Sequence, residues 1–238
     1  MKITNIELSQ IDTVILAGGL GTRLKPILKD KPKCLAPING KPFIDILIDN
    51  YIEQGLKRFI LCVGYLKEQV IEYLCDRNDC EIVFSKEDKP LGTGGALKKA
   101  QSLIKSDHYI VLNGDSFIEI DIYKYIKWFQ LIQNDISIVI TKINNSKRYG
   151  NVTFDKNGLI TSFGKKNNSS LPAKINAGVY LFKKNTIDFS HFSDEFSIET
   201  EFFPSLIKRG IKTYYCKGKF IDIGTKNSFQ DSQLFFNK

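Results

Sequence analysis

The sequence predicts an α/β fold in which helices flank a mixed, mainly parallel sheet. Up to about residue 142, short β-branched or apolar runs alternate with amphipathic stretches, which is the pattern of consecutive strand–helix–strand units. After residue 142 the expected strands are separated by turn residues, which predicts a small antiparallel elaboration beside the parallel sheet. The 238 residues, with a hydrophobic content of 42%, allow a substantial core. We therefore expect residues 1–238 to form a single domain with two halves, 13–142 and 143–238.

The first half is expected to alternate strands with helices. Strands are predicted at residues 13–17, 58–63, 81–85, 109–112 and 136–141, where β-branched and apolar residues cluster. Helices are predicted near residues 42–54, 67–74, 95–104 and 122–133. In the first of these helices, apolar residues recur at three- and four-residue steps, as a helix with one buried face requires. These residues are Phe43, Ile46, Leu47, Ile48 and Tyr51.

The second half is expected to contain shorter strands and two helices. The predicted strands are at residues 151–154, 159–163, 176–182 and 213–216. A helix is predicted near residues 199–208, and a C-terminal helix begins at Lys226. Residues 165–170 form a polar low-complexity stretch, for which we expect a mobile loop.

Composition argues against a membrane or secreted protein. The longest apolar runs, such as residues 59–63 and 109–112, are far shorter than the roughly 20 residues of a membrane-spanning helix. The first residues mix charged and apolar positions, unlike a secretion signal. The five cysteines form an odd set without a CxxC pair, so we expect them to be free and reduced. We therefore expect a cytoplasmic protein with no membrane partner.

The net charge of +8 permits an anionic partner, either nucleic acid, anionic lipid or a phosphorylated small molecule. No run of Lys and Arg reaches the roughly five to eight residues of a basic nucleic-acid patch, and no RNA-binding aromatic motif is present. We therefore expect no nucleic-acid partner. With only His108 and His191, the chain has too few ligands for a Cys/His zinc site and few candidates for a catalytic triad.

A glycine-rich stretch, TVILAGGLGTRLKP, includes and follows the first predicted strand. Gly18, Gly19 and Gly21 would let backbone N–H groups surround phosphate oxygens, and Arg23 adds a planar set of donors for the same anion. This composition favours an anion-binding turn over a merely tight turn. The spacing matches neither a P-loop nor the dinucleotide fingerprint G-x-G-x-x-G, because Leu24 stands where a third glycine is required.

The same loop begins a series of motifs. L-A-G-G-L-G-T-R-L at 16–24 is followed by P-K-C-L-A-P at 32–37, E-D-K-P-L-G-T-G-G-A at 87–96, N-G-D at 113–115, N-A-G-V-Y at 176–180 and F-I-D-I-G-T at 220–225. In this order they resemble the signature of the sugar-1-phosphate nucleotidyltransferases. The resemblance implies a Rossmann-like fold of the nucleotide-diphospho-sugar transferase type. It makes residues 13–142 the nucleotide-binding half and residues 143–238 the sugar-binding half.

Within this family the N-G-D triplet and the L-G-T-G-G-A loop look most like bacterial guanylyltransferases that act on D-glycero-α-D-manno-heptose 1-phosphate. Mannose-1-phosphate guanylyltransferases and other hexose-1-phosphate nucleotidyltransferases are the alternatives. The hexapeptide repeats of an additional acyltransferase domain are missing. The resemblance implies that a nucleoside triphosphate, with GTP favoured, and a sugar 1-phosphate give pyrophosphate and an NDP-sugar for capsule or lipopolysaccharide, with GDP-heptose favoured.

The implied chemistry is an in-line attack by a sugar-phosphate oxygen on the α-phosphorus of the triphosphate. The second pKa of a phosphate monoester is about 6, so the nucleophile is mostly ionised at neutral pH and needs no general base. Catalysis must instead neutralise charge, which calls for Mg²⁺ held by carboxylates. Asp115 and Asp222 each follow or end a predicted strand and are expected to meet at the carboxyl edge of the sheet. Capping of a turn or helix is the alternative role for each.

The resemblance assigns the site residues to three groups. The catalytic group is Arg23 on the β- and γ-phosphates, Lys33 near the transferring and leaving groups, and the metal ligands Asp115 and Asp222. The nucleotide-binding group is Leu16, Ala17, Gly18, Gly19, Gly21, Thr22, Arg23, Glu87, Leu91, Gly92, Thr93, Asn113 and Gly114. The sugar-phosphate-binding group is Tyr149, Gly150, Lys166, Asn176 and Gly178.

One position departs from the family pattern. Members carry F-x-E-K, in which the Glu holds a sugar hydroxyl, whereas this chain has Lys165 in place of that acid and keeps the cation at Lys166. Glu199 or Glu201 is then expected to contact the sugar hydroxyls. A non-catalytic nucleotide-sugar-binding regulatory module is the alternative class of function, and the presence of both aspartates disfavours it. The oligomeric state stays open, with a homo-oligomer among the alternatives.

Overall fold

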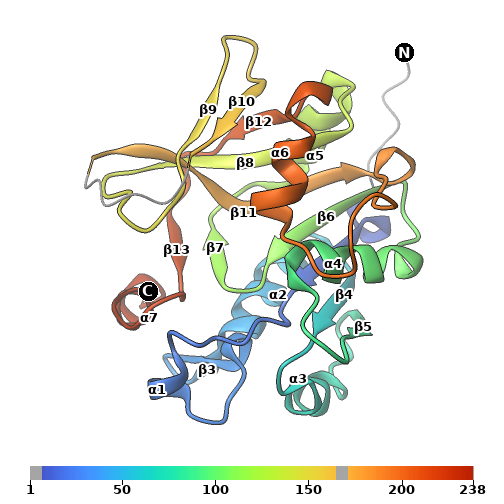
Figure 1. Ribbon diagram of the computed structural model, residues 1–238. Coiled ribbons are helices and arrows are strands. Elements are labelled where there is room, and N and C mark those ends of the chain that lie inside the picture. The colour runs from blue at the N-terminus through green and yellow to red at the C-terminus, as the bar shows by residue number, and fades with distance from the viewer. Residues whose placement is uncertain (1–6, 165–170, 238) are drawn as a thin grey trace.

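The computed structural model describes residues 7–164 and 171–237, and its centre is a seven-stranded sheet (Figure 1). The strands lie in the order β12, β8, β11, β6, β1, β4, β5. Their bounds are β1 Asp12–Leu16, β4 Arg58–Val63, β5 Glu81–Lys86, β6 His108–Asn113, β8 Ile136–Ile143, β11 Ala173–Lys183 and β12 Lys212–Tyr215. Every neighbouring pair is parallel except the two made by β11. The predicted α/β class with a mainly parallel sheet is confirmed.

Alternate residues of the strands face two separate apolar clusters, one on each side of the sheet. Ile15 and Leu61 belong to one cluster, and their neighbours Val14 and Ile60 to the other. This alternation is the period-two geometry of a strand buried on both faces. The helices that accompany the sheet are α2 Phe43–Glu53, α3 Lys67–Leu74, α4 Gly92–Ala100, α5 Ile122–Ile132 and α7 Lys226–Phe235, with the short α1 Lys25–Leu28 and α6 Phe203–Ser205.

The second half differs from the prediction because β11 lies inside the main sheet, between β6 and β8. The expected position beside the parallel sheet was wrong. Residues 177–182 of β11 are all buried, as a strand covered on both faces requires. The antiparallel elaboration is limited to short ribbons: β9 Val152–Phe154 with β10 Ile160–Phe163, β7 Ser116–Ile118 with β13 Phe220–Asp222, and β2 Pro37–Ile38 with β3 Lys41–Pro42.

Two helix predictions were wrong in their extent. Helix α4 begins at Gly92, upstream of the predicted residue 95, and continues as the 3₁₀ turn η3 Gln101–Leu103. The predicted helix near 199–208 is broken into the π turn η5 Ile198–Phe202, α6 and the 3₁₀ turn η6 Ile207–Arg209. Pro204 lies at the start of α6, where its missing N–H costs no helical hydrogen bond. Further 3₁₀ turns are η1 Leu8–Gln10, η2 Lys33–Leu35 and η4 Lys184–Thr186.

Two other sequence predictions concern features outside the sheet. The loop expected at 165–170 lies outside the described residues. All five cysteines are free, as predicted. Among the described residues, none of the helices combines the length and the apolar character that crossing a bilayer requires.

A buried carboxylate ties the first strand to the segment before β6. Asp12, 1% exposed, accepts hydrogen bonds from the backbone N–H of Lys105 at 2.5 Å and of Ser106 at 2.8 Å. It also forms an ion pair with Arg58 of β4 at 2.5 Å. Burial raises the pKa of Asp12, but the Ser106 and Arg58 donors outweigh burial and lower it overall.

We predict that Asp12→Ala lowers the free energy of unfolding by about 3 kcal/mol, because the partly buried Arg58 and two N–H donors would lose their acceptor. Urea denaturation measures this change. Asp135→Ala is the matched control, because Asp135 pairs with Arg209 at 2.9 Å where both side chains are more exposed. A loss of about 0.5 kcal/mol is expected there. Equal losses in the two variants would contradict the structural role of Asp12.

Candidate active site

The glycine-rich loop between β1 and α1 has a shape that depends on two of its glycines. A Cβ atom at Gly18 would overlap Oε1 of Glu87 and lie 3.2 Å from the backbone nitrogen of Gly64. Gly21 has a φ of +59° and packs against the side chain of Lys33, so the turn requires a residue without a Cβ there. Gly19 has nothing within 4 Å of its Cβ position.

This loop lines a cavity of about 460 Å³ at the carboxyl edge of the sheet. Every residue that the sequence predicted for nucleotide binding lines it, together with Lys33 and Asp115. The far wall comes from the start of α4, where the N–H groups of Gly94 and Gly95 donate to the carbonyl of Phe196. The cavity is therefore enclosed by the loop, α4 and the end of β6.

A second cavity, of about 780 Å³, adjoins the first. Tyr149, Gly150, Asn176 and Gly178 line it, as does Asp222, whereas Lys166 lies outside the described residues. The residues that line both cavities are Arg23, Asn113, Asp115, Glu199 and Gly224. Two ligands bound in the two cavities would therefore meet beside Arg23 and Asp115.

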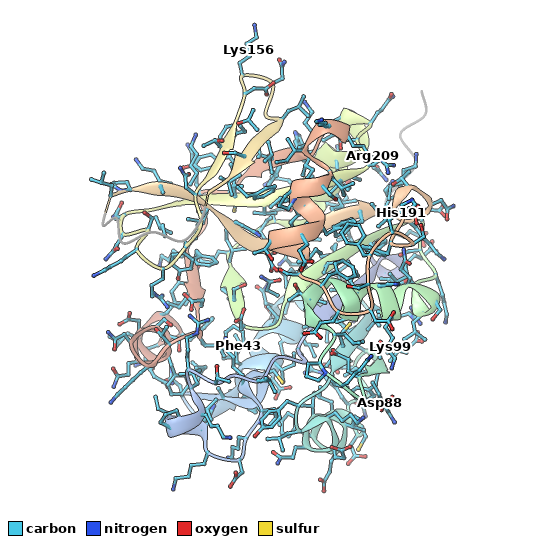
Figure 2. The ribbon with its side chains drawn as sticks, in the orientation of Figure 1. Phe43, Asp88, Lys99, Lys156, His191 and Arg209 are labelled. Carbon is cyan, nitrogen blue, oxygen red and sulfur yellow. The ribbon has the colours of Figure 1, made fainter. Side chains whose placement is uncertain are left out.

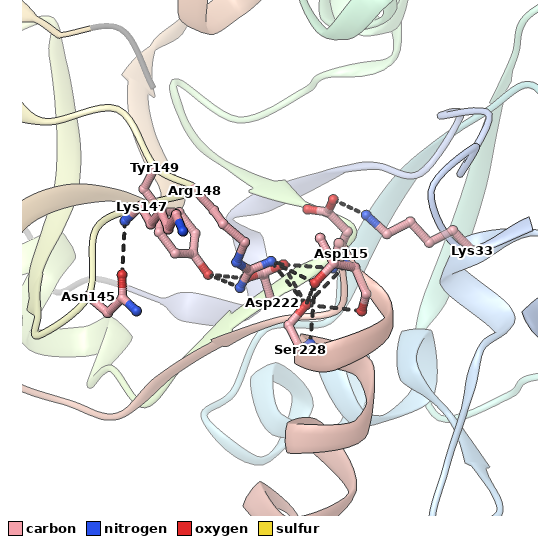
Figure 3. A network of polar contacts seen from close by, with 10 residues as sticks. Lys33, Asp115, Asn145, Lys147, Arg148, Tyr149, Asp222 and Ser228 are labelled. Carbon is pink, nitrogen blue, oxygen red and sulfur yellow. Dashed lines mark hydrogen bonds and ion pairs between the residues drawn. The ribbon is translucent and has the colours of Figure 1, made fainter. Parts of the chain in front are cut away.

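Asp115 and Asp222 come together because β7 pairs with β13. Asp222 is opposite Ser116 in this antiparallel pair, and the N–H of Ile223 donates to the carbonyl of Asp115 at 2.9 Å. Lys33 forms an ion pair with Oδ2 of Asp115, whose side chain is 42% exposed (Figure 3). Both aspartates were predicted to lie at the carboxyl edge of the main sheet. Asp115 lies there because it follows β6, whereas Asp222 reaches the same place from the separate β7–β13 ribbon.

Asp222 is surrounded by donors. Arg148, Tyr149, Ser228 and the backbone N–H of Gly224 all donate to its carboxylate (Figure 3). Burial raises the pKa of this carboxyl, but the Tyr149 hydroxyl and the Arg148 guanidinium outweigh burial and hold the pKa below its usual range. Asp222 is thus an anion at neutral pH although it is only 8% exposed.

Glu87 also lines the first cavity, where its carboxyl lies beside Gly18. It is 6% exposed, and within the described residues its carboxylate accepts one hydrogen bond, from the N–H of Leu91 at 3.3 Å. Burial raises the pKa of Glu87 above its usual range, and the Leu91 donor opposes this only in part. Its carboxylate therefore has acceptor positions left for a ligand.

Glu199, rather than Glu201, borders the second cavity. Its carboxylate accepts hydrogen bonds from Thr93 at 2.9 Å and from the side chain of Asn113 at 3.4 Å. Glu201 instead accepts from the N–H of Ser197 at 2.8 Å and lines neither cavity. Of the two acids considered from the sequence, only Glu199 can contact a ligand held between the cavities.

Sequence reasoning missed Arg148 and Ser228. Arg148 stands directly before Tyr149 and Gly150, which were both predicted as site residues, so its place in the R-Y-G segment could have indicated it. Ser228 belongs to the capping box of α7, where it bonds with Thr225. Nothing in the sequence indicated that this cap would also bind Asp222.

The donor set suits a magnesium ion more than a metal with a complete protein shell. Among the described residues, no group of three or more His, Cys, Asp or Glu side chains lies together. Asp115 and Asp222 could supply one or two carboxylates, and substrate phosphates and water would supply the other ligands, as Mg²⁺ prefers. The exposed Asp115 fits this role directly, whereas Asp222 fits it once one of its present donors moves.

Comparison with known proteins identifies related chains. The family model described as nucleotidyl transferase matches residues 12–238. D-glycero-alpha-D-manno-heptose 1-phosphate guanylyltransferase of Campylobacter jejuni is 39% identical over 222 residues, which cover 92% of this chain and 97% of that protein. Mannose-1-phosphate guanylyltransferase catalytic subunit beta of Drosophila pseudoobscura is 31% identical, over 91% of this chain and 60% of that protein. The crystal structure of HddC from Yersinia pseudotuberculosis complexed with GMP-PN superimposes with a TM-score of 0.84 and 34% identity, covering 95% of this chain and 100% of that chain.

We predict that Gly18→Ala lowers the free energy of unfolding by about 1 kcal/mol, because the new methyl group would displace the buried carboxyl end of Glu87 and lie 3.2 Å from the backbone nitrogen of Gly64. Gly19→Ala is the matched control one residue away. Its methyl group meets no neighbour, so its stability should stay within about 0.5 kcal/mol of the native chain. Chemical denaturation of both variants measures the difference, and equal stability of the two would refute the close packing of the loop on Glu87.

Proposed function

The chain belongs to the nucleotidyl transferase family and is a sugar-1-phosphate nucleotidyltransferase, and we propose that it transfers GMP from GTP to D-glycero-α-D-manno-heptose 1-phosphate. The single observation that carries this proposal is the junction of two cavities at Arg23 and Asp115, one of them lined by the glycine loop. A triphosphate in the first cavity and a sugar phosphate in the second would meet there. The relative of higher identity supports the heptose, and mannose 1-phosphate is the second candidate substrate.

The reaction joins an oxygen of the sugar phosphate to the α-phosphorus of GTP. The bond from the α-phosphorus to its bridging oxygen breaks, and pyrophosphate leaves with that electron pair. The sugar phosphate is already a dianion near neutral pH, so no residue has to remove a proton. The protein therefore acts by aligning two polyanions and neutralising the charge between them.

Arg23 and Lys33 are the cations that we assign to the triphosphate. Arg23 lines both cavities. Its guanidinium lies beside the turn that follows Asp222, because a Cβ atom added at Gly224 would be 3.6 Å from Nη2 of Arg23. Lys33 is only 14% exposed and is oriented by Asp115, on the wall of the nucleotide cavity. We propose that Asp115 and Asp222 hold Mg²⁺. When bound, the ion withdraws electron density from the phosphates and stabilises the leaving pyrophosphate.

Glu87 provides a basis for selecting guanine. Guanine presents two adjacent N–H donors, N1–H and the 2-amino group, whereas adenine and cytosine present an acceptor at the ring nitrogen. The carboxylate of Glu87 is buried and has free acceptor positions, so it complements the two N–H donors of guanine. The ring nitrogen of adenine or cytosine would instead face the carboxylate as a second acceptor, without a hydrogen bond. We therefore assign base selection to Glu87.

Glu199 supplies the acid that Lys165 does not. Its carboxylate borders both cavities and is held by Thr93 and Asn113, so it is oriented before a sugar arrives. We propose that it accepts hydrogen bonds from sugar hydroxyls, together with Asn176 and the Gly178 backbone, which line the same cavity.

We further propose that the protein works in the cytoplasm, where GTP is abundant and free cysteines stay reduced. Its product would be a GDP-sugar consumed by glycosyl transfer during capsule or lipopolysaccharide synthesis.

The first prediction from this function concerns turnover. Asp115→Asn and Asp222→Asn should each lower kcat at least about a hundredfold, about 2.7 kcal/mol of transition-state stabilisation, while the fold survives. Pyrophosphate release is measured with Mg²⁺ for GTP, CTP, dTTP, UTP and ATP against heptose, mannose and glucose 1-phosphates. Absence of turnover with every pair would leave the regulatory-module alternative, and near-native rates in both variants would remove the aspartates from the reaction.

A second prediction separates base selection from sugar selection. Glu87→Gln should lower kcat/KM for GTP about 30-fold, roughly 2 kcal/mol, because an ionised acceptor of guanine is lost. The KM for the sugar 1-phosphate should change little. Glu199→Gln should instead raise the KM for the sugar 1-phosphate about tenfold. Steady-state kinetics with each substrate varied in turn measures both. Equal effects of the two variants on both substrates would contradict the assignment.

A further inference from the structure

Both oxygens of the Asp222 carboxylate are occupied by donors of the chain itself. Oδ1 accepts from the N–H of Gly224 at 2.6 Å and from the Ser228 hydroxyl at 3.1 Å. Oδ2 accepts from the Tyr149 hydroxyl and from Nη2 of Arg148 at 2.8 Å, and Nη1 of Arg148 lies 3.3 Å from Oδ1. A carboxylate offers about four lone-pair positions. A metal ion can therefore reach Asp222 only if one of these donors leaves.

Arg148 is the donor that we expect to leave, because it is the cation among the four, whereas the Tyr149 hydroxyl, the Ser228 hydroxyl and the Gly224 N–H are neutral and do not compete with a metal ion for charge. Gly224 donates through its backbone two residues from Asp222, and Ser228 is fixed in the capping box of α7. The Arg148 side chain is 38% exposed and lines the larger cavity. Its guanidinium also donates to the hydroxyl groups of Thr225 at 3.0 Å, Ser228 at 3.2 Å and Tyr149 at 2.9 Å, and it lies over the Tyr149 ring, 5.1 Å from the centroid. All of these additional partners are uncharged.

The backbone that carries Arg148 is anchored on both sides. Ser146 donates through its hydroxyl to the carbonyl of Leu171 at 2.8 Å, and the N–H of Tyr149 donates to the carbonyl of Ser146 at 2.9 Å. Gly150 packs closely against the carbonyl of Gly164. The guanidinium can therefore move by side-chain rotation while the loop stays in place.

Lys33 does not create the same obstacle at Asp115. That carboxylate is 42% exposed, and among the described residues the contacts of its side chain are limited to the pair between Oδ2 and Lys33. A cation can approach the other oxygen while Lys33 remains. Of the two cations that neutralise the aspartates, only Arg148 has to be displaced.

We propose that Arg148 is a positioning residue that occupies Asp222 in the substrate-free protein, yields it to the metal, and then binds the phosphate of the sugar 1-phosphate. This inference rests on the proposed function, in which Asp115 and Asp222 share a metal. The Arg148–Asp222 ion pair breaks, and the carboxylate–metal and guanidinium–phosphate contacts replace it. No buried charge is left unpaired at either stage, which avoids the several kcal/mol that an isolated buried carboxylate would cost. Arg148 also keeps Asp222 oriented before the metal arrives.

The test measures Mn²⁺ binding to the substrate-free protein by titration calorimetry or by the electron paramagnetic resonance of free Mn²⁺. Arg148→Met removes the competing cation and keeps most of the stem length. We expect it to bind Mn²⁺ about tenfold more tightly than the native chain, a difference of about 1.4 kcal/mol. The KM for the sugar 1-phosphate should rise in the same variant, while the KM for GTP changes little.

Arg209→Met is the matched control. Arg209 also pairs with a single aspartate, Asp135, at similar exposure, but it lines neither cavity and projects from η6 at the upper right of the molecule (Figure 2). Its affinity for Mn²⁺ should equal that of the native chain. Unchanged or weaker Mn²⁺ binding by Arg148→Met would overturn the proposal, since a merely structural arginine would give that result.

Two further variants keep the test decisive. Should Arg148→Met fail to fold by circular dichroism, Arg148→Lys keeps a charge without the two-pronged contact and should tighten Mn²⁺ binding by a smaller factor. Binding no tighter than native would again overturn the exchange. Asp222→Asn should weaken Mn²⁺ binding. If it does not, the metal assignment of the proposed function fails and the exchange falls with it. If it does and Arg148→Met still binds no more tightly, only the exchange fails.

Discussion

The functional cleft depends on one short antiparallel pairing, between β7 and β13. This pairing places Asp222 opposite Ser116 and so beside Asp115, more than a hundred residues earlier in the chain. Behind it, Phe117 of β7 packs edge-on against Phe235 and Phe236 at the end of α7, with ring centroids 6.0 and 5.1 Å apart. The end of the C-terminal helix is thereby held against β7, the strand that directly follows Asp115. This hydrophobic contact supports the strand whose pairing with β13 positions the second aspartate.

The two buried acids of the cleft differ because their donors differ. Asp222 and Glu87 are both less than 9% exposed, and burial alone would raise the pKa of each. Asp222 receives a guanidinium, two hydroxyls and a backbone N–H, which keep it ionised. From the part of the chain that the structure describes, Glu87 receives a single long hydrogen bond, donated by Leu91, so burial dominates and its pKa rises. An acid already satisfied by cations suits exchange with another cation, whereas an acid with free acceptor positions suits a ligand that brings N–H donors.

The sequence predicted those parts of the fold and of the site that are marked by a long apolar run or by a motif of several residues. The five strands that the first half contributes to the main sheet were found within one or two residues, because most of them are apolar runs bounded by polar residues. The residues of the nucleotide cavity followed from motifs beside those strands. The ribbon of β7 and β13 could not be predicted, since three residues are too few for a period-two pattern and their partner is remote. The place of β11 inside the sheet was missed for a related reason: its buried residues indicate a central strand but do not say which neighbours it has.

Glu199 reaches the two cavities from the first turn of η5, at the start of the region predicted as one helix near 199–208. Residues two apart on a helical turn point to opposite sides, so Glu199 lies between the two cavities while Glu201 stays outside them. Thr93 fixes this turn from the nucleotide side, because it donates to Glu199 and accepts from the N–H of Ile198, each at 2.9 Å. Thr93 lies in the first turn of α4, which forms a wall of the first cavity. The acid that borders both cavities is therefore held by the helix that lines the first one, through the Thr93 hydroxyl and through the N–H groups of Gly94 and Gly95, which donate to the carbonyl of Phe196 just before η5.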